Sequence, residues 1–579
     1  MSEIWPGLTG NDRLVRFGAN AADGDRCPEK RAAKARPAVR PAYGSSARKK
    51  FLNDFPLGVV SDALDAVEFD EVPWERAIIR AIEQSEAPLH PGAIRWIWHG
   101  VRTYLAVAAL MDSPATSPVS RYWVAQRQGS EDTVWEMYAW GRRYESLDGS
   151  VRELRLLRFG EANAAPDAEE WDASAESDDP AAGKRALEEA DRRRMARVAI
   201  AAYSAAFGSP ATWPRPWSDP FRLPRGPQPV IQEVRIVEVG LSGGQPTVLF
   251  YGKPAKAKAL YEQHARDQVR LIRPGGKAQP GQDCADCKLL TACREVQRVP
   301  GVLGITEPTA PLRSWSVSNG RYYQECPAED HLRRLRLPKD YEYNEAAERG
   351  QAIHARLAEH HARQPRRGCI AADLPPEADW GAGGWQATGE QASLGRRMLA
   401  NHVELCALHR TEEITKVLVE PTIAVHDTDA NVIVIAKPDM LYIEDGAWVW
   451  HELKTKQGLR WSYGDLLRDV PQLALAVVLM AENALPLGTG ALVGARIELE
   501  LLAPDAADML LIDPNDPAQV VAARQIVHEL AAPWHGDLVA TARPGDHCAH
   551  CPVKRWCPDA PPSRRASSAI AHDEGKRAR

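Results

Sequence analysis

Eight of the ten cysteines follow a repeated pattern that suits metal chemistry. Two clusters share the spacing Cys-x2-Cys-x5-Cys, CADCKLLTAC at 284–293 and CAHCPVKRWC at 548–557. Each supplies three thiolates, one fewer than a zinc site or a cubane iron–sulfur cluster uses. We expect the fourth ligand far upstream, where Cys27 and Cys326 are each followed by proline. The predicted ligand sets are Cys27, Cys284, Cys287 and Cys293, and Cys326, Cys548, Cys551 and Cys557.

Iron and zinc are the two metals to compare for these sets. Zinc ribbons usually place two cysteine pairs within about 12–20 residues of each other. Here a single cysteine joins three others across more than 200 residues. This favours a 4Fe–4S cluster that links the first and last segments of a domain, and zinc remains the alternative, above all for the first set. Cys369 and Cys406 are left over, and we expect them to be buried structural thiols.

A second group of residues has the types and spacing of a divalent-metal site. AWVWHELKTK (447–456) is predicted to be a strand, and the Asp-Gly pair at 445–446 predicts a hairpin turn before it. Because side chains alternate along a strand, Glu452 and Lys454 share one face. Asp439 lies on the preceding strand, across the hairpin from Glu452. Two adjacent carboxylates repel each other, and a divalent cation relieves that repulsion.

Lys454 adds a cation to the same predicted site. An ammonium group there can orient or help deprotonate a metal-activated water and stabilise negative charge on phosphate. For the Glu452–Lys454 pair alone, a surface ion pair is the alternative interpretation.

These residues resemble the PD-(D/E)XK signature, with Asp439 and Glu452-Leu453-Lys454 in its positions. ERGQAIHARLAEHH (348–361) is predicted to be a helix that carries His354 four residues after a glycine. The RecB-like nucleases have a similar order, in which a Gly-x3-His helix, Glu, Asp, Glu-x-Lys and a helix with Gln follow one another. The two remaining positions would be Glu420 and Gln472.

The cysteines extend this resemblance over residues 315–560. In the iron–sulfur branch of the family, one cysteine precedes the core and Cys-x2-Cys-x5-Cys follows it, as Cys326 and 548–557 do here. The CRISPR-associated RecB-like exonucleases and the nuclease domains of AddAB-type helicase–nucleases are similar in this respect.

The resemblance implies an α/β fold and a metal-dependent deoxyribonuclease that hydrolyses phosphodiester bonds. Asp439 and Glu452 would bind Mg2+ or Mn2+, with His354 and the Leu453 carbonyl as further ligands. Lys454 and Gln472 would complete the catalytic set. The expected activity is that of an exonuclease on single-stranded or processed DNA ends, in DNA repair or genome defence.

The first half resembles a degenerate copy of the same plan. Cys27 opens it and the cluster at 284–293 closes it. Between them, residues 135–158 resemble a hairpin with an Asp148-Gly149 turn, and Glu153-Leu154-Arg155 aligns with Glu452-Leu453-Lys454. The position of Asp439 falls near Arg143 or Tyr144, so the second carboxylate is missing. An unrelated domain with a three-cysteine zinc knuckle is the alternative.

The predicted architecture is therefore two tandem RecB-like domains of the restriction-endonuclease type, each a mixed central sheet flanked by helices. The boundaries are 1–305 for the degenerate domain, 306–562 for the nuclease domain and 563–579 for a disordered tail.

Composition limits the remaining possibilities. The chain has 579 residues, a net charge of −6 and no long apolar run, so we expect a cytoplasmic protein with no membrane partner. DNA is the expected partner. No Walker motif occurs, so any helicase would be a separate subunit. The rival hypothesis is a non-catalytic DNA-binding or assembly subunit with structural iron–sulfur or zinc clusters.

Overall fold

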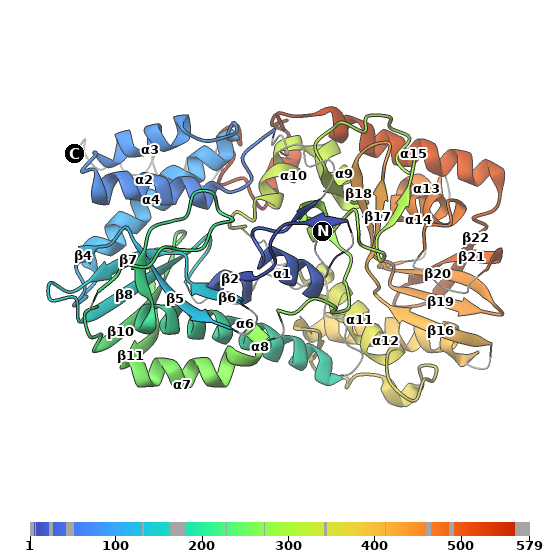
Figure 1. Cartoon of the computed structure of the whole chain (residues 1–579). Coiled ribbons are helices and arrows are strands. Elements are labelled where there is room, and N and C mark those ends of the chain that lie inside the picture. The colour runs from blue at the N-terminus through green and yellow to red at the C-terminus, as the bar shows by residue number, and fades with distance from the viewer. Residues whose placement is uncertain are drawn as a thin grey trace, which may run out of the picture.

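The chain folds as a mixed α/β protein in which several mixed sheets are flanked by helices (Figure 1). Every strand pairing among the described residues joins strands on the same side of residue 296, so we call residues up to 296 the first half and the rest the second half. This computed structural model describes residues 5, 7–22, 27–41, 51–129, 132–162, 180–226, 228–270, 272–340, 344–410, 413–458, 465–485 and 491–561.

The second half contains a five-stranded sheet with the order β16-β19-β20-β21-β22. β20 and β21 run parallel, and the other neighbours are antiparallel. The predicted hairpin is confirmed: β19 and β20 are joined by Asp445 and Gly446, which both have positive φ. The strands are β16 (Ile414–Val419), β19 (Met440–Glu444), β20 (Ala447–Thr455), β21 (Ala491–Leu502) and β22 (Ala507–Ile512).

Helices cover both faces of this sheet, as the alternation along β20 predicts. Trp448 and Trp450 pack against α14 and α15, and Val449 and Leu453 pack on the opposite side against α11 and α12. The predicted helix at 348–361 is confirmed as α11. The helices of this half are α9 (Val317–Glu325), α10 (Pro327–Arg334), α11 (Glu345–His361), α12 (Gly389–Leu405), α13 (Leu466–Asp469), α14 (Pro471–Ala481) and α15 (Pro517–Gly536).

Two segments rich in β-branched residues, 417–425 and 432–443, each contribute to two strands that belong to different sheets. The first segment breaks at Glu420-Pro421 and the second at Pro438. Proline has no amide hydrogen to donate to a sheet ladder, so a strand ends there. The second sheet has the order β12-β17-β18-β13, with β12 (Gln297–Val299), β17 (Ile423–Asp427), β18 (Val432–Ala436) and β13 (Arg313–Trp315).

The first half has a five-stranded sheet with the order β4-β7-β8-β10-β11. Its neighbours are antiparallel, antiparallel, parallel and antiparallel, which is the same sequence of directions as in β16-β19-β20-β21-β22. The predicted hairpin at 135–158 is present as β7 and β8, with Gly149 in the turn. The strands are β4 (Ser117–Pro118), β7 (Arg142–Glu145), β8 (Val151–Arg158), β10 (Glu233–Gly240) and β11 (Pro246–Gly252).

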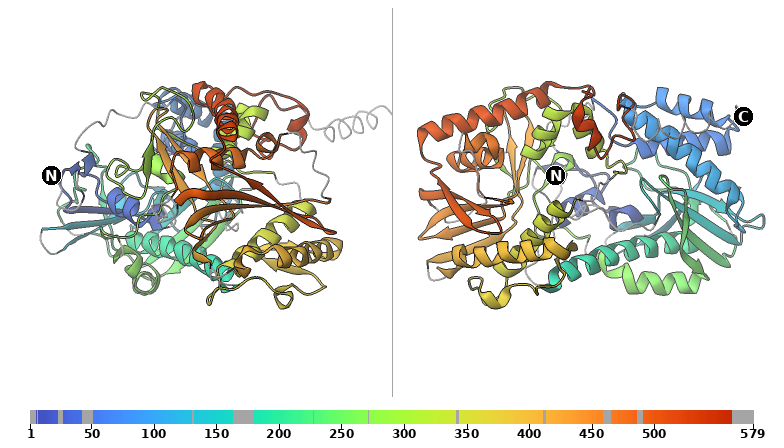
Figure 2. Two further views of the ribbon diagram at one scale, coloured as in Figure 1. Left: turned by 90° about the vertical axis from the view of Figure 1, so that its right-hand side faces the viewer. Right: turned by 180° about the vertical axis from the view of Figure 1, so that it is seen from behind.

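Helices α2, α3 and α4 cover one face of this sheet, and α6 and α7 cover the other. α6 also reaches α11 of the second half (Figure 2). The helices are α1 (Pro28–Lys34), α2 (Pro56–Phe69), α3 (Trp74–Glu83), α4 (Pro91–Leu110), α6 (Pro180–Phe207), α7 (Pro254–His264) and α8 (Arg266–Arg270). The other strands are β2 (Leu14–Gly18), β6 (Val134–Tyr138), β5 (Tyr122–Gln128) and β9 (Ser209–Ala211), which form one sheet, and the pairs β1 (Leu8–Thr9) with β3 (Arg40–Pro41) and β14 (Trp380–Ala382) with β15 (Trp385–Ala387).

Two further predictions from the sequence concern the domain boundary at 305/306 and the C-terminal tail. β12 lies before the predicted boundary at 305/306 and pairs with β17 of the second half. The predicted tail at 563–579 lies outside the described residues. In the part of the chain that the structure describes, no helix is both long and apolar enough to cross a membrane.

Each three-cysteine segment packs against the opposite half. Cys284 and Leu290 share a buried cluster with Ala424 and Ile433 of β17 and β18. Conversely, the segment at 551–557 packs on α2 to α4. There His90 Nε2 is 3.0 Å from the Ala540 carbonyl oxygen, and Arg95 donates to the Cys557 carbonyl oxygen. The two halves are therefore joined through their cysteine segments.

We expect Gly92→Val to destabilise the protein by about 1–3 kcal/mol, because overpacking forces neighbours to move. A Cβ atom at Gly92, in the first turn of α4, would lie 2.8 Å from the Leu332 side chain and 3.1 Å from the Trp556 carbonyl oxygen. Urea unfolding checks this. Gly160→Val is the control, because a Cβ atom there meets nothing within 4 Å. Equal unfolding midpoints for the two variants would contradict this packing between the halves.

Candidate functional site

Asp439 lies between Pro438 and the first residue of β19, and each of its carboxylate oxygens has its own partner. Oδ1 is 2.7 Å from Nδ1 of His354 on α11, and Oδ2 accepts a 2.7 Å hydrogen bond from the Leu453 amide. Because Met440 pairs with His451, Asp439 and Glu452 are the next neighbours in the register of β19 and β20. The structure thus brings together residues from a helix and two strands.

Glu452 is 4% exposed and points to the face of β20 that carries the tryptophans. Its Oε1 accepts a 3.0 Å hydrogen bond from Trp450 Nε1, and its Oε2 is 3.5 Å from Lys454 Nζ. The alternation predicted for this strand therefore holds, and the ion pair joins a buried carboxylate to an ammonium group that is 33% exposed.

The two carboxylates differ strongly in their electrostatics. Burial and the charge of Asp439 raise the pKa of Glu452 to about 7. Burial opposes the ionisation of Asp439, but His354, Lys454 and the Leu453 amide hold its pKa well below the usual range. Burial likewise opposes protonation of His354, yet Asp439 raises its pKa. Two neighbouring carboxylates, one of which resists ionisation, are a donor set that a divalent cation would stabilise, so these residues fit such an ion.

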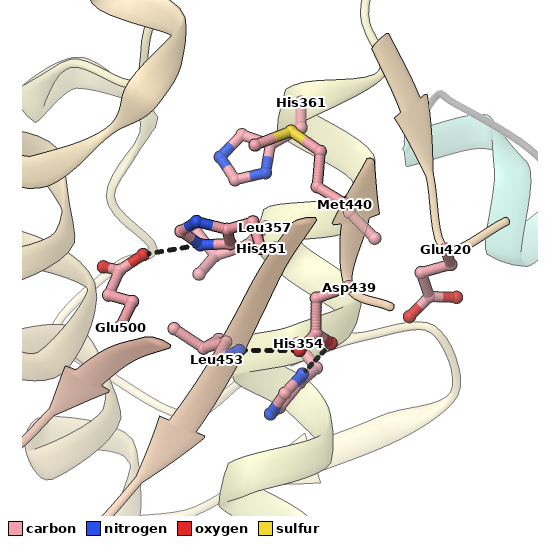
Figure 3. A pocket seen from close by; sticks show the side chains of 10 residues that line it. His354, Leu357, His361, Glu420, Asp439, Met440, His451, Leu453 and Glu500 are labelled. Carbon is pink, nitrogen blue, oxygen red and sulfur yellow. Dashed lines mark hydrogen bonds and ion pairs between the residues drawn. The ribbon is translucent and has the colours of Figure 1, made fainter. Parts of the chain in front are cut away.

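A pocket opens beside Asp439 (Figure 3). Asp439 and His354 are each 24% exposed, so solvent and a ligand can reach them. Glu420 faces the same pocket with a positive φ of 44°, which is unusual for a residue other than glycine. Its amide donates to the Asp439 carbonyl oxygen over 2.9 Å, and its Oε2 is 3.2 Å from Lys437 Nζ. The lining residues are His354, Leu357, Ala358, His361, Glu420, Asp439, Met440, His451, Leu453 and Glu500.

Gln472 and Gly350 complete the residues expected from sequence. Gln472 lies in the first turn of α14, and its Oε1 is buried without a hydrogen-bond partner among the described residues. It does not line the pocket. A Cβ atom at Gly350 would lie 3.1 Å from Thr455 Oγ1, so the glycine allows α11 to approach the end of β20.

The two cysteine segments have the same local structure. Cys27 and Cys326 are the N-cap residues of α1 and α10, and the proline after each stands at the first helical position, where no amide hydrogen is needed. Cys284 and Cys548 lie in the short 3-10 helices η2 (Gln282–Asp286) and η5 (Asp546–Ala549). The amide of the glycine three residues before each donates to its sulfur, over 3.3 and 3.5 Å.

Cys27 and Cys326 each lie close enough to other cysteines of their own set to affect the pKa of those thiols. Burial raises the pKa of Cys284 to about 12, and the charges of Cys287, Cys293 and Cys27 add to the rise. In the second set, burial raises the pKa of Cys551 to about 12, with a contribution from Cys326. Cys326 also raises the pKa of Cys557, after the larger effect of burial.

The segment that contains the pocket, β19, β20 and the second cysteine set also has a counterpart among known protein families. Residues 314–558 match the family model of the PD-(D/E)XK nuclease superfamily. Members of this superfamily generally hydrolyse phosphodiester bonds with divalent metals, so the match agrees with the donor set around Asp439. No curated protein matches the chain.

In the first half, the residue next to Glu153 on the neighbouring strand is a tyrosine, whereas the residue next to Glu452 in the second half is Asp439. Tyr144 is the register partner of Glu153, as Asp439 is of Glu452. The Tyr144 hydroxyl contacts the Tyr104 hydroxyl at 2.6 Å and bonds to Glu68, and the Arg155 guanidinium lies 3.8 Å from the centre of its ring. A phenol and the Arg155 guanidinium therefore lie beside Glu153, whereas a carboxylate, Asp439, lies beside Glu452 in the second half.

We expect Glu153→Gln to lower the free energy of unfolding by about 3–5 kcal/mol, because it leaves buried cations without their counter-charge. Glu153 is fully buried and is 2.6 Å from Arg155 Nε and 2.8 Å from Arg235 Nη1. Urea unfolding measures the effect. Glu83→Gln, at an exposed position on α3, is the control. An unchanged unfolding midpoint for Glu153→Gln would mean that this ion-pair network does not stabilise the first half.

Proposed function

We propose that the second half is a RecB-like, metal-dependent deoxyribonuclease, most suited to exonuclease action on single-stranded or processed DNA ends. The observation that carries the proposal is the junction at Asp439, whose carboxylate is held by His354 and the Leu453 amide beside Glu452. DNA repair and genome defence are the processes in which such an activity would serve, with a helicase as a separate partner.

The candidate residues divide the chemistry between them. Asp439, Glu452 and the Leu453 carbonyl would hold Mg2+ or Mn2+, which when bound supplies a Lewis acid that activates water and neutralises phosphate charge. His354 orients Asp439 through Nδ1, so Nε2 is the nitrogen left for an ion or a phosphate oxygen. Lys454 donates hydrogen bonds to the attacking water and to the phosphate. The water oxygen bonds to phosphorus and one P–O ester bond breaks, while one proton of the water is transferred to the leaving oxygen and the other stays on the new phosphate monoester.

We also propose that each cysteine set binds a 4Fe–4S cluster. Four thiols per set, backbone amides that donate to sulfur, and a fourth cysteine at a helix start all support this. In each set a single cysteine joins three others across more than 200 residues, which favours a cluster that links two ends of a domain over a zinc knuckle. Zinc is therefore the less favoured occupant.

The first half is best interpreted as a degenerate copy of the second. The same order and directions of strands in the two five-stranded sheets support a duplication, as do the matching cysteine segments. Tyr144 in place of a carboxylate argues against catalysis there. The rival, a non-catalytic DNA-binding or assembly subunit, is disfavoured by the accessible Asp439 carboxylate beside the buried Glu452, since a purely structural role does not require two adjacent carboxylates.

Asp439→Ala and Glu452→Ala should each abolish metal-dependent cleavage of end-labelled DNA while the iron content is unchanged. A single remaining carboxylate holds Mg2+ poorly, because that ion gives up its waters reluctantly. Lys454→Ala should lose most activity but keep metal binding. Asp445→Asn, which removes a charge from the exposed turn of the same hairpin, is the control. Asp439 and Glu452 variants that cut as fast as the parent would make the scaffold the better account.

Anaerobically purified protein should be brown and contain about eight iron atoms per chain, four for each cubane. Cys326→Ser and Cys284→Ser should each halve the iron content, because each removes one of four ligands from one cluster. Iron analysis and the visible absorption spectrum test this. Two zinc atoms in the cysteine sets and no iron would contradict the proposal while leaving the nuclease assignment open.

A further inference from the structure

A second group of metal-ligating side chains lies on the far side of the pocket from His354. It consists of His361, Cys369, His402 and Cys406, which are between 1% and 7% exposed. His361 is the last residue of α11 and His402 lies in the last turn of α12, whereas Cys406 caps α12. Four potential ligands thus meet at the carboxyl ends of two helices, where the helix dipoles favour a cation.

The distances suit one tetrahedral ion. Bonds of 2.0–2.1 Å to nitrogen and 2.3 Å to sulfur place the ligand atoms of such an ion about 3.3–3.8 Å apart. Here Nε2 of His361 is 3.1 Å from Nε2 of His402 and 3.7 Å from Sγ of Cys406. All four ligand atoms lie within 4.8 Å of one another, and among the described residues this is the group that meets that limit.

The surroundings orient these ligands as a bound metal would require. His402 Nδ1 is 2.6 Å from Oε1 of Glu500, so Nδ1 is the donor and Nε2 presents its lone pair to the group. The amide of Cys369 donates to Sγ of Cys406 over 3.4 Å. Two thiolates would balance a divalent ion, so the complete buried site would carry no net charge.

We propose that His361, Cys369, His402 and Cys406 bind a structural zinc ion. Sulfur and imidazole ligands in a tetrahedral arrangement favour zinc, and four protein ligands without solvent access describe a structural rather than a catalytic site. The same burial argues against a catalytic role for Cys406, since no substrate could reach its sulfur. The proposal does not depend on nuclease activity.

The zinc ion would fix the helix that carries His354. His361 follows His354 by seven residues on α11, so both lie on one face. On the sheet side, Glu500 also contacts His451 Nε2 at 3.1 Å, and His451 directly precedes Glu452 on β20. The ion would therefore brace both the helix and the strand that supply the candidate nuclease residues.

Zinc analysis and zinc X-ray absorption of the full chain, purified without chelators, test the proposal. We expect about one zinc atom per chain, bound to two nitrogens and two sulfurs. Cys369→Ser and Cys406→Ser should each lose that zinc and keep the iron. His409→Ala, at an exposed position three residues after Cys406, and Asp439→Ala should both keep it.

The parent protein alone can overturn the proposal, so it stays testable if the cysteine variants fail to fold. Protein without zinc, or zinc surrounded by sulfur alone, would overturn it. Zinc surrounded by sulfur alone would place the ion in the cysteine sets and would leave the nuclease assignment unaffected. Loss of cleavage in Asp439→Ala with zinc retained would support both the zinc site and the nuclease assignment.

Discussion

The candidate site depends on two prolines that end strands. Pro421 and Pro438 cannot continue a sheet ladder, so the chain leaves one sheet and enters the other at each of them. The residues beside them, Glu420 and Asp439, consequently lie at the crossing, joined by the hydrogen bond from the Glu420 amide to the Asp439 carbonyl. Glu420 has a positive φ, so the backbone is locally strained where the chain passes from one sheet to the other. Carboxylates held where two sheets part are accessible from a pocket yet anchored by rigid strands.

Local patterns in the sequence predict much of this arrangement. The Asp445-Gly446 turn, the alternation along β20 and the helix that carries His354 each follow from rules that act over a few residues, and each is confirmed. The crossing between sheets could not be predicted in the same way. A segment rich in β-branched residues predicts a strand, but it does not determine with which other strand that strand will pair. The prolines within the segments were the available signal, since each marks a place where a ladder must stop.

The group of His361, Cys369, His402 and Cys406 could not be predicted from the sequence for a different reason. Cys369 and Cys406 are buried as expected, but their histidine neighbours were not foreseen. His361 and Cys369 are separated by a loop, and Cys369 is separated from His402 by the strands β14 and β15 and by most of α12. No short motif links residues that come together only when two helices pack. The cysteines at 284–293 and 548–557 were recognisable because three of their four ligands lie within ten residues.

Because each cysteine segment packs on the opposite half, the first segment cannot be covered until part of the second half has been translated. The first set is complete once residue 293 has left the ribosome, but β17 and β18, which cover it, end only at residue 436. At about 5–20 residues per second, this leaves an interval on the order of ten seconds. During it, the second half cannot yet cover the first set, so a metal bound by the proposed set would have an interval during translation in which to be delivered.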